Sequence, residues 1–402
     1  MVIRSAIQCS SCDSKFITRT QVGHKDRQEH SFPCPKCGVQ ISYILDIDQR
    51  NVKTSFREPR NAKWSVSEDG ALETLTFSDE VLVPVDLGGM FSPFIATFGN
   101  YVDFDKYRQD EGLRQLFVTQ SFHYADRCLI HFERGNWNLF DKESPAPTEE
   151  LQTPLSRLLG LYNLFHAGFS KFTLNSGGRN DRIMQRLTLA RTVSPALFSQ
   201  LANEFLSSGR ILKLWNEIAA IRRSFIENYN GIQPLYQVYY WREELRNLGA
   251  FRLSDKKFDS FRQLYIDCFE TTCRLMVPAI GMEMIILYKS LEIPTKKGTM
   301  TLDDFEALPN ASKREHIGKC PIEDLFVPVI DTGLRNGVGH NSAHFEKKSD
   351  QIILYDSKGS ATISQQLGYT EFCDRVVKLF AAFELAVMYH YGLHIFLKGR
   401  LS

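Results

Sequence analysis

Apolar positions along the chain change period near residue 150. The segment QISYILDID at 40–48 alternates apolar and polar residues, which predicts a strand with one buried face. The short apolar runs VLVPVDL and CLIHFE suggest further strands, and ERGNWNLF suggests a hairpin that turns at Gly135–Asn136. We therefore expect a β-rich domain over residues 49–145, closed by the Pro-, Ser- and Glu-rich linker DKESPAPTEELQTP.

Beyond the linker the apolar positions recur at helical spacing. Thr153–Pro154 and Ser194–Pro195 each place a capping residue before a proline at the first helical position. The predicted helices are 154–170, 195–208, 210–228, 232–248, a long one over 255–291 kinked at Pro278, 322–339 and 369–392. We expect a loop at 290–301 and a β-hairpin at 347–364. The predicted domains are 1–48, 49–145, 151–250 and 255–395.

Composition places the chain among ordinary globular proteins with more than one domain. It has 402 residues, 43% hydrophobic and 24% charged, with a net charge of +1. The most apolar run, Phe380–Leu397, contains Glu384, His390 and His394, so we expect a buried helix and no membrane span. An odd number of cysteines, nine, and no visible secretory signal favour the cytoplasm.

Charge is unevenly distributed although the total is small. Residues 1–60 hold ten basic and six acidic side chains, and residues 179–252 hold eleven basic and six acidic ones. Residues 100–150 are acidic, with ten acids and six bases. This segregation permits a basic face for nucleic acid, and an ordinary solvated surface explains it almost as well.

Two cysteine pairs near the N-terminus indicate a metal site. Cys9 and Cys12 form one CxxC pair and Cys34 and Cys37 the other, and the second sits in the turn-forming context CPKCG. Four thiolates fill a tetrahedral zinc site and leave no open position, so the predicted zinc is structural. A redox dithiol would need only one pair, and His24 or His30 between the pairs offers a substitute ligand. We expect a small zinc ribbon over residues 1–48.

A second group of candidate residues lies in LRNGVGHNS at 334–342. It places Arg335 and His340 five residues apart with Asn336 beside the arginine. On an ideal helix five steps separate two side chains by roughly 140°, so convergence requires the helix to loosen, which Gly337 and Gly339 allow. Neutral histidine can act as a general base near neutral pH, and arginine offers a fixed planar cation to an anionic group.

The segment resembles the HEPN ribonuclease family. That family carries an arginine, often followed by asparagine, and a histidine four to six residues after the arginine, at the end of its third core helix. Arg335, Asn336 and His340 match this pattern, and the resemblance covers roughly residues 255–395. It implies a C-terminal helical bundle, a homodimer with facing motifs, and metal-independent RNA cleavage. A role as a toxin or anti-phage effector, with a protein trigger or inhibitor, also comes from the resemblance.

Other interpretations of the same residues stay open. Arginine and histidine near a helix C-terminus interact favourably with its free carbonyls, and some proteins of this family bind RNA or protein without cutting. The alternative function is thus a non-catalytic adaptor with a zinc ribbon. His344 is a second candidate histidine, although a strand position suits it better, and Glu283 is expected to be a satisfied buried carboxylate.

Overall fold

The computed structural model describes most of the chain. The described residues are 1–23, 25–48, 50–51, 53–66, 72–87, 92–144, 153–174, 177–207, 210–317, 320, 322–339, 343–346, 349–355 and 363–398. The chain divides into two compact units, and each is assembled from separate stretches. The first unit comprises residues 1–107, 226–263 and 336–377; the second comprises 108–225, 264–335 and 378–402.

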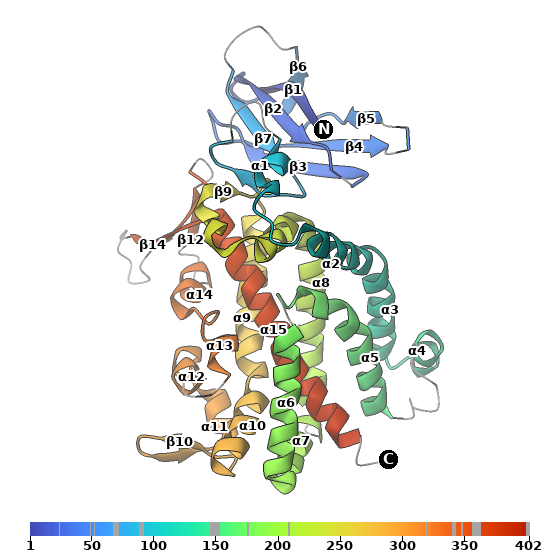
Figure 1. The fold of residues 1–402 in the computed structure, drawn as a ribbon, viewed down its shortest axis with the longest axis vertical. Coiled ribbons are helices and arrows are strands. Elements are labelled where there is room, and N and C mark those ends of the chain that lie inside the picture. Colours follow the sequence, from blue (N-terminus) through green and yellow to red (C-terminus); the bar gives the residue numbers. More distant parts are fainter. Residues whose placement is uncertain are drawn as a thin grey trace. The chain divides into compact units, whose positions relative to one another are not determined.

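The N-terminal part of the first unit is built from two small sheets (Figure 1). One sheet has the order β6-β1-β2-β7, with β1 (Val2–Cys9), β2 (Lys15–Gln21), β6 (Ala62–Ser65) and β7 (Thr74–Phe77), and the other has β3 (Arg27–Pro33), β4 (Gln40–Asp48) and β5 (Lys53–Phe56). Neighbouring strands are antiparallel except β2 and β7, which are parallel. Strand β4 alternates half-buried and buried residues along its length, so the strand predicted from its pattern is confirmed.

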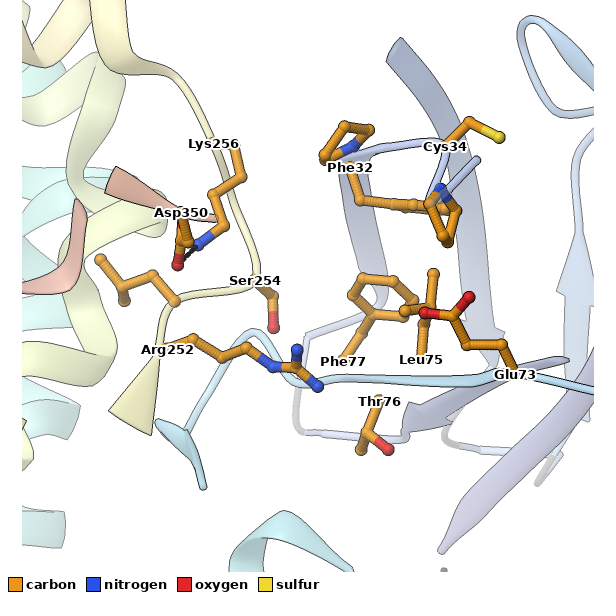
Figure 2. Close-up of a pocket in the computed structure, with 13 residues that line it drawn as sticks. Phe32, Cys34, Glu73, Leu75, Thr76, Phe77, Arg252, Ser254, Lys256 and Asp350 are labelled. Carbon is orange, nitrogen blue, oxygen red and sulfur yellow. Dashed lines mark hydrogen bonds and ion pairs between the residues drawn. The ribbon is translucent and has the colours of Figure 1, made fainter. Parts of the chain in front are cut away.

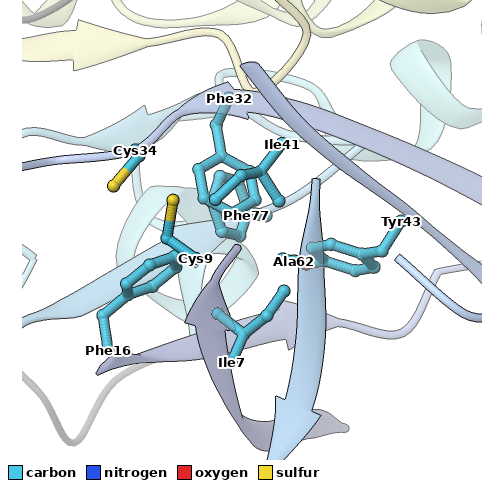
Figure 3. Close-up of a cluster of buried hydrophobic side chains, with 9 residues drawn as sticks. All are labelled: Ile7, Cys9, Phe16, Phe32, Cys34, Ile41, Tyr43, Ala62 and Phe77. Carbon is cyan, nitrogen blue, oxygen red and sulfur yellow. The ribbon is translucent and has the colours of Figure 1, made fainter. Parts of the chain in front are cut away.

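A compact aromatic core fills the space between these strands. It contains Ile7, Cys9, Phe16, Phe32, Cys34, Ile41, Tyr43, Ala62 and Phe77 (Figure 3). The rings of Phe32 and Phe77 lie 4.7 Å apart, within the range in which aromatic pairs attract one another. Two of the paired cysteines belong to this core, so the predicted metal site and the hydrophobic core share one packing environment.

The rest of the first unit adds short elements and a three-stranded meander. The short ones are β8 (Val83–Pro84), β9 (Phe251–Arg252), α1 (Pro93–Phe98) and the 3₁₀ turns Gln237–Tyr240, Glu243–Leu245 and Leu248–Ala250. The meander consists of β12 (Ala343–Glu346), β13 (Gln351–Tyr355) and β14 (Ile363–Gly368), all antiparallel. This confirms the predicted hairpin in the C-terminal third.

The second unit is helical. It holds most of α2 (Phe104–Leu116), then a π-helical turn Phe117–Ser121, α3 (Phe122–Glu133), α4 (Trp137–Glu143), α5 (Pro154–Phe169), the 3₁₀ turn Ser170–Phe172, α6 (Gly177–Val193), α7 (Pro195–Ser207), α10 (Val277–Tyr288), α11 (Leu302–Ala307), α12 (Asn310–Ile317) and α13 (Glu323–Phe326). A two-stranded hairpin, β10 (Ile293–Thr295) with β11 (Gly298–Met300), follows α10. The division between units falls inside α8 (Arg210–Tyr236), α9 (Phe258–Leu275), α14 (Thr332–Gly339) and α15 (Tyr369–Lys398) as well.

Buried ion pairs cross the helical core of the second unit. Arg222 on α8 donates two hydrogen bonds, of 2.9 and 2.8 Å, to the carboxylate of Glu384 on α15. Arg186 on α6 also donates two hydrogen bonds, to the carboxylate of Glu283 on α10, whose side chain is fully buried. Each pair neutralises charges that would be costly alone, so they define which helices are neighbours more than they stabilise the core. The expectation that Glu283 is a satisfied carboxylate is confirmed.

The strands predicted between residues 93 and 143 are wrong. CLIHFE lies in α3, whose buried residues Phe122, Ala125, Cys128, Leu129 and Phe132 recur at helical spacing. A six-residue apolar run is too short to separate the two periods, and the flanking residues that complete the helical stripe decide for the helix. Gly135 does form the expected turn, with φ of +65°, but the turn joins α3 to α4.

Several predicted helices differ in their limits. The long helix over 255–291 is two helices that break at Met276, and Pro278 lies in the first turn of α10, where its missing N–H costs nothing. The helix predicted at 322–339 is the separate α13 and α14, and 290–301 contains the β10–β11 hairpin instead of a loop. Helix α8 ends at Tyr236 and continues into 3₁₀ turns.

Two helical stretches are long and apolar enough to cross a membrane by length and composition alone. They are Phe258–Tyr288 and Tyr369–Phe396, and 78% and 89% of their most apolar windows are buried inside the protein. Core helices of globular proteins satisfy the same test, so these stretches are weak evidence for a membrane span.

Candidate functional site

The four paired cysteines come together at one edge of the N-terminal sheets. Cys9 is the last residue of β1, and Cys34 follows the last residue of β3 directly. The four sulfur atoms all lie within 4.8 Å of one another. Sγ of Cys9 lies 3.7 Å from that of Cys37, and Sγ of Cys12 lies 3.7 Å from that of Cys34. Figure 3 shows the sulfurs of Cys9 and Cys34 pointing toward each other from the aromatic core.

Two similar turns aim these thiols inward. In each turn the first cysteine pairs with a backbone group five residues on: the Cys9 N–H donates to the Ser14 carbonyl at 3.0 Å, and the Cys34 N–H donates to the Val39 carbonyl at 2.8 Å. The residue after each second cysteine is left-handed, with φ of +56° at Asp13 and +76° at Gly38. Glycine reaches this conformation freely, and aspartate is among the few other residues that tolerate it.

The four-cysteine geometry suits one tetrahedral metal ion. A zinc–sulfur bond of about 2.3 Å in a tetrahedron puts neighbouring sulfurs roughly 3.8 Å apart, and the two measured distances are close to this value. The predicted assembly of Cys9, Cys12, Cys34 and Cys37 is therefore confirmed as a group that can hold a metal ion. His30 is no part of this group, because its ring is buried beside Asp79 at 3.2 Å. His24 lies outside the described residues.

Ser14 tunes the electrostatics of this cluster. Its hydroxyl lies 3.0 Å from Sγ of Cys12 and 3.5 Å from Sγ of Cys34. The hydrogen bond from Ser14 lowers the pKa of Cys12. For Cys34, burial raises the pKa, but hydrogen bonds from Ser14 and from the backbone of Cys37 and Lys36 outweigh it and bring the pKa to about 6. A thiol that ionises easily is a ready metal ligand, because metals bind the thiolate.

The remaining five cysteines are buried away from this cluster. They are Cys128, Cys268, Cys273, Cys320 and Cys373. Burial raises the pKa of Cys128 to about 11 and that of Cys273 to about 12, and it raises those of Cys268 and Cys373 as well. These side chains behave as small apolar core residues.

The second predicted group lies on α14 and just beyond it. Asp331 begins this helix: its carboxylate accepts from the Leu334 N–H at 3.0 Å, and its carbonyl accepts from the Arg335 N–H at 3.0 Å. Arg335 is half-buried and Asn336 is exposed. His340 follows the last residue of the helix and lies outside the described residues, so the distance between Arg335 and His340 is not part of the described geometry.

Arg335 belongs to a polar cluster of the second unit that sequence reasoning missed. Its Nη2 lies 2.6 Å from Oε1 of Glu270 on α9, with the two side chains 27% and 35% exposed. The other oxygen of Glu270 accepts from Asn310 at 2.9 Å, and Asn310 in turn accepts from Lys313 at 3.3 Å. Burial lowers the pKa of Lys313. The sequence offered no usable signal for this cluster, because its members come from separate helices and meet only in the fold.

A contact within the chain explains why position 337 is a glycine. A Cβ atom added at Gly337 would lie 2.9 Å from Cδ1 of Leu354 on β13, closer than real Cβ atoms approach any heavy atom. The glycine therefore lets the meander pack directly on the end of α14 within the first unit. The contact that keeps this position small is therefore made by a side chain of the same chain.

His344, the second candidate histidine, lies on β12, so the strand position expected for it is confirmed. Its side chain is exposed. Trp215 and Trp241 are buried with exposed fractions of 1% and 0%, so they belong to the core.

Comparisons with known proteins give no relative. No protein-family model, no curated protein and no solved structure matches this chain.

Proposed function

We propose that this protein is an endoribonuclease that cuts RNA without a catalytic metal, with Arg335, Asn336 and His340 as its catalytic group. The observation that supports it best is the placement of Arg335. Its guanidinium is anchored at 2.6 Å to Glu270, remains 27% exposed, and sits on the helix that ends one residue before His340. An oriented, accessible arginine is what stabilisation of a phosphoryl transition state requires. The resemblance of RNGVGH to the HEPN motif supports the same function.

The proposed step is an internal transfer on RNA. The imidazole of His340 takes the proton of a ribose 2′-hydroxyl, and the 2′ oxygen forms a bond to the adjacent phosphorus. The bond from phosphorus to the 5′ oxygen breaks, and that oxygen leaves with a proton from water or from the second His340 of a homodimer. Arg335 stabilises the negative charge on the phosphoryl oxygens, and Asn336 orients the phosphate. The products are a 2′,3′-cyclic phosphate and a free 5′-hydroxyl.

The four-cysteine cluster holds a structural zinc in this proposal. Its sulfur spacing fits a zinc–sulfur tetrahedron, and four thiolates leave no position for a reacting water. Cys9, Cys12, Cys34 and Cys37 would hold the ion, which would link the ends of β1 and β3. The metal takes no part in RNA cleavage.

The assembly and setting follow from the family resemblance. We infer a cytoplasmic homodimer formed through residues 255–395, with the two motifs facing each other, and a role as a toxin or anti-phage effector under a protein trigger or inhibitor. Light scattering at micromolar concentration tests the dimer, and a clean monomer contradicts it. A bulky residue at Gly339 should weaken the dimer or the activity.

A non-catalytic adaptor that binds RNA or protein is the second candidate, and one contact favours it. The Glu270 carboxylate already occupies part of the Arg335 guanidinium, so the pair would serve as an ordinary structural ion pair. In that case the zinc ribbon and the helical bundle would hold a partner without cutting it.

Cleavage of single-stranded RNA by the purified full-length protein separates the two functions. His340→Ala should abolish cleavage and retain RNA binding, and Arg335→Ala should slow it by about 10²–10³. His344→Ala and Arg314→Ala are matched controls, because both residues are exposed and neither belongs to the proposed group. DNA, which lacks the 2′-hydroxyl, should survive. A 5′-phosphate product, or strict dependence on added magnesium, would contradict the mechanism.

The substitution Glu270→Gln tests whether the ion pair between Arg335 and Glu270 contributes to catalysis. If Glu270 positions Arg335, the variant should lower kcat about tenfold with KM nearly unchanged, because the arginine then acts in the transition state. A variant with higher activity would show that Glu270 restrains the arginine instead of positioning it, whereas the adaptor function expects no cleavage by either protein.

A further inference from the structure

A cavity of about 220 Å³ lies within the first unit and is distinct from both groups above (Figure 2). One wall comes from the N-terminal sheets and is largely apolar, with Phe32, Leu75 and Phe77. The other wall comes from the segment around β9 and from the start of β13, and it is polar. Cys34 contributes to the lining, but Figure 2 shows its sulfur pointing away from the cavity, so the cavity is not the metal site.

The polar wall contains one cation that is already neutralised. Lys256 donates to the Asp350 carboxylate at 2.7 Å, and its ammonium lies 4.6 Å from the centre of the Tyr369 ring. Burial lowers the pKa of Lys256, so the partnership with Asp350 keeps a costly charge in place. This pair therefore contributes no net charge to the cavity.

Arg252 is a different case. Among the described residues, its guanidinium has no hydrogen bond and no ion pair, and Figure 2 shows it extending into the cavity. Its backbone is fixed by the pairing of β9 with β8. Burial lowers the pKa of Arg252, and the nearby carboxylates of Asp350 and Glu73 offset this only in part. Arginine keeps its proton in proteins, so a half-buried guanidinium is charged here with no direct hydrogen bond to a carboxylate in the described part of the chain. Such a group is costly for the fold and suited to an anionic ligand.

Ser254 adds a second donor beside Arg252. Its Oγ accepts from the Ser78 N–H at 2.8 Å, and its own hydroxyl hydrogen has no acceptor in the described part of the chain. The residue is 8% exposed, so water reaches this hydroxyl chiefly through the cavity. The guanidinium and the hydroxyl together can bind the two oxygens of one anionic group.

We propose that this cavity binds a small carboxylate with an apolar or aromatic body. Arg252 and Ser254 would hold the carboxylate, and the body would pack on Phe32, Leu75 and Phe77. Glu73 in the lining favours a singly charged ligand over a doubly charged phosphate, since a second negative charge would lie close to this carboxylate. The volume holds a ligand of roughly one ring with a short substituent, below the usual range of drug-sized sites. This inference does not rest on RNA cleavage.

Three related probes test the chemistry on the full-length, metal-loaded protein: benzoate, its neutral counterpart benzamide, and doubly charged phenyl phosphate. Titration calorimetry or ligand-observed NMR should rank benzoate first, with benzamide about tenfold weaker or more because the charge-assisted bond is lost. Equal binding of benzoate and benzamide, or no binding of benzoate at tens of millimolar, overturns the proposal.

Two substitutions test whether benzoate binds in this cavity. Arg252→Gln should weaken benzoate binding about tenfold to a hundredfold and leave the melting temperature equal or higher, because the guanidinium makes no hydrogen bond or close ion pair in the described part of the chain. Arg4→Gln, an exposed arginine on β1, is the matched control and should change neither. Glu73→Gln should strengthen benzoate binding. If it instead lowers the melting temperature and leaves binding unchanged, Arg252 is simply paired with Glu73 and the proposal is wrong.

Discussion

The four-cysteine cluster and the Arg335 motif differ in how completely the described structure assembles them. The cysteines come from two turns separated by 21 residues, yet all four sulfurs converge within 4.8 Å. The motif occupies a few consecutive residues, but its arginine is bound to Glu270 from a distant part of the chain. A tetrahedral metal site holds its ligands at nearly fixed distances from one ion, so paired CxxC spacings almost dictate such a site. The members of the proposed catalytic pair, Arg335 and His340, impose no such constraint on each other.

The largest expected effect is on the cysteine cluster. Replacing Cys34 and Cys37 by serine should remove about one zinc per chain and unfold the N-terminal sheets, since metal binding to such sites contributes roughly 10 kcal/mol to folding. Elemental analysis and circular dichroism measure the two results. Ser10→Ala, an exposed position inside the first pair, is the control. Unchanged metal content in the double variant would show that the cluster is not a metal site.

Acid should affect the helical unit through a different group. His390 on α15 is buried and donates to the Leu275 carbonyl at 3.3 Å, and burial lowers its pKa to about 4. In the unfolded chain histidine titrates near pH 6.5, so between these values only the unfolded state takes up the proton. The contribution of His390 to the free energy of unfolding is therefore fully present above about pH 6.5. It is lost as the pH drops toward 4, by about 3 kcal/mol in total.

Urea unfolding between pH 7 and 4.5 measures this effect. His390→Leu should flatten the dependence in the helical unit, with metal content followed in parallel because acid also protonates thiolates. The expectation fails if the variant shows the same loss of stability with pH as the parent.

The smallest effect concerns the packing beside the motif. Gly337→Ala places a Cβ 2.9 Å from Leu354 and should lower stability by about 1–3 kcal/mol, as overpacking does. Gly333→Ala on the same helix is the matched control, because its nearest neighbour lies at an ordinary 3.4 Å. Leu354→Ala should restore part of the loss in the Gly337→Ala background. Equal melting temperatures for the two alanine variants would show that the meander does not press on α14.

The sequence predicted elements best where one pattern was long and unmixed. β4, α5, α7 and α15 lie where their apolar periods placed them. The prediction for the α3 region was wrong because the six-residue segment CLIHFE, with four apolar residues, fits both a strand and a helix. Phe122 and Ala125, which precede the segment, complete the apolar face of the helix. The assembly of the four paired cysteines was predictable from spacing alone. Glu270 and the Arg252 cavity were not, because both depend on residues brought together from separate stretches.

The burial of five cysteines has a practical consequence for chemical labelling. Cys37 is exposed and Cys12 is half-buried, whereas Cys128, Cys268 and Cys373 lie in the core with thiols that resist ionisation. An alkylating reagent reacts with accessible thiolates, so the native protein should accept labels only at the cluster. If the cluster holds the proposed metal, labelling should occur only after the metal is removed, and the intact mass of the alkylated protein would then report metal occupancy molecule by molecule.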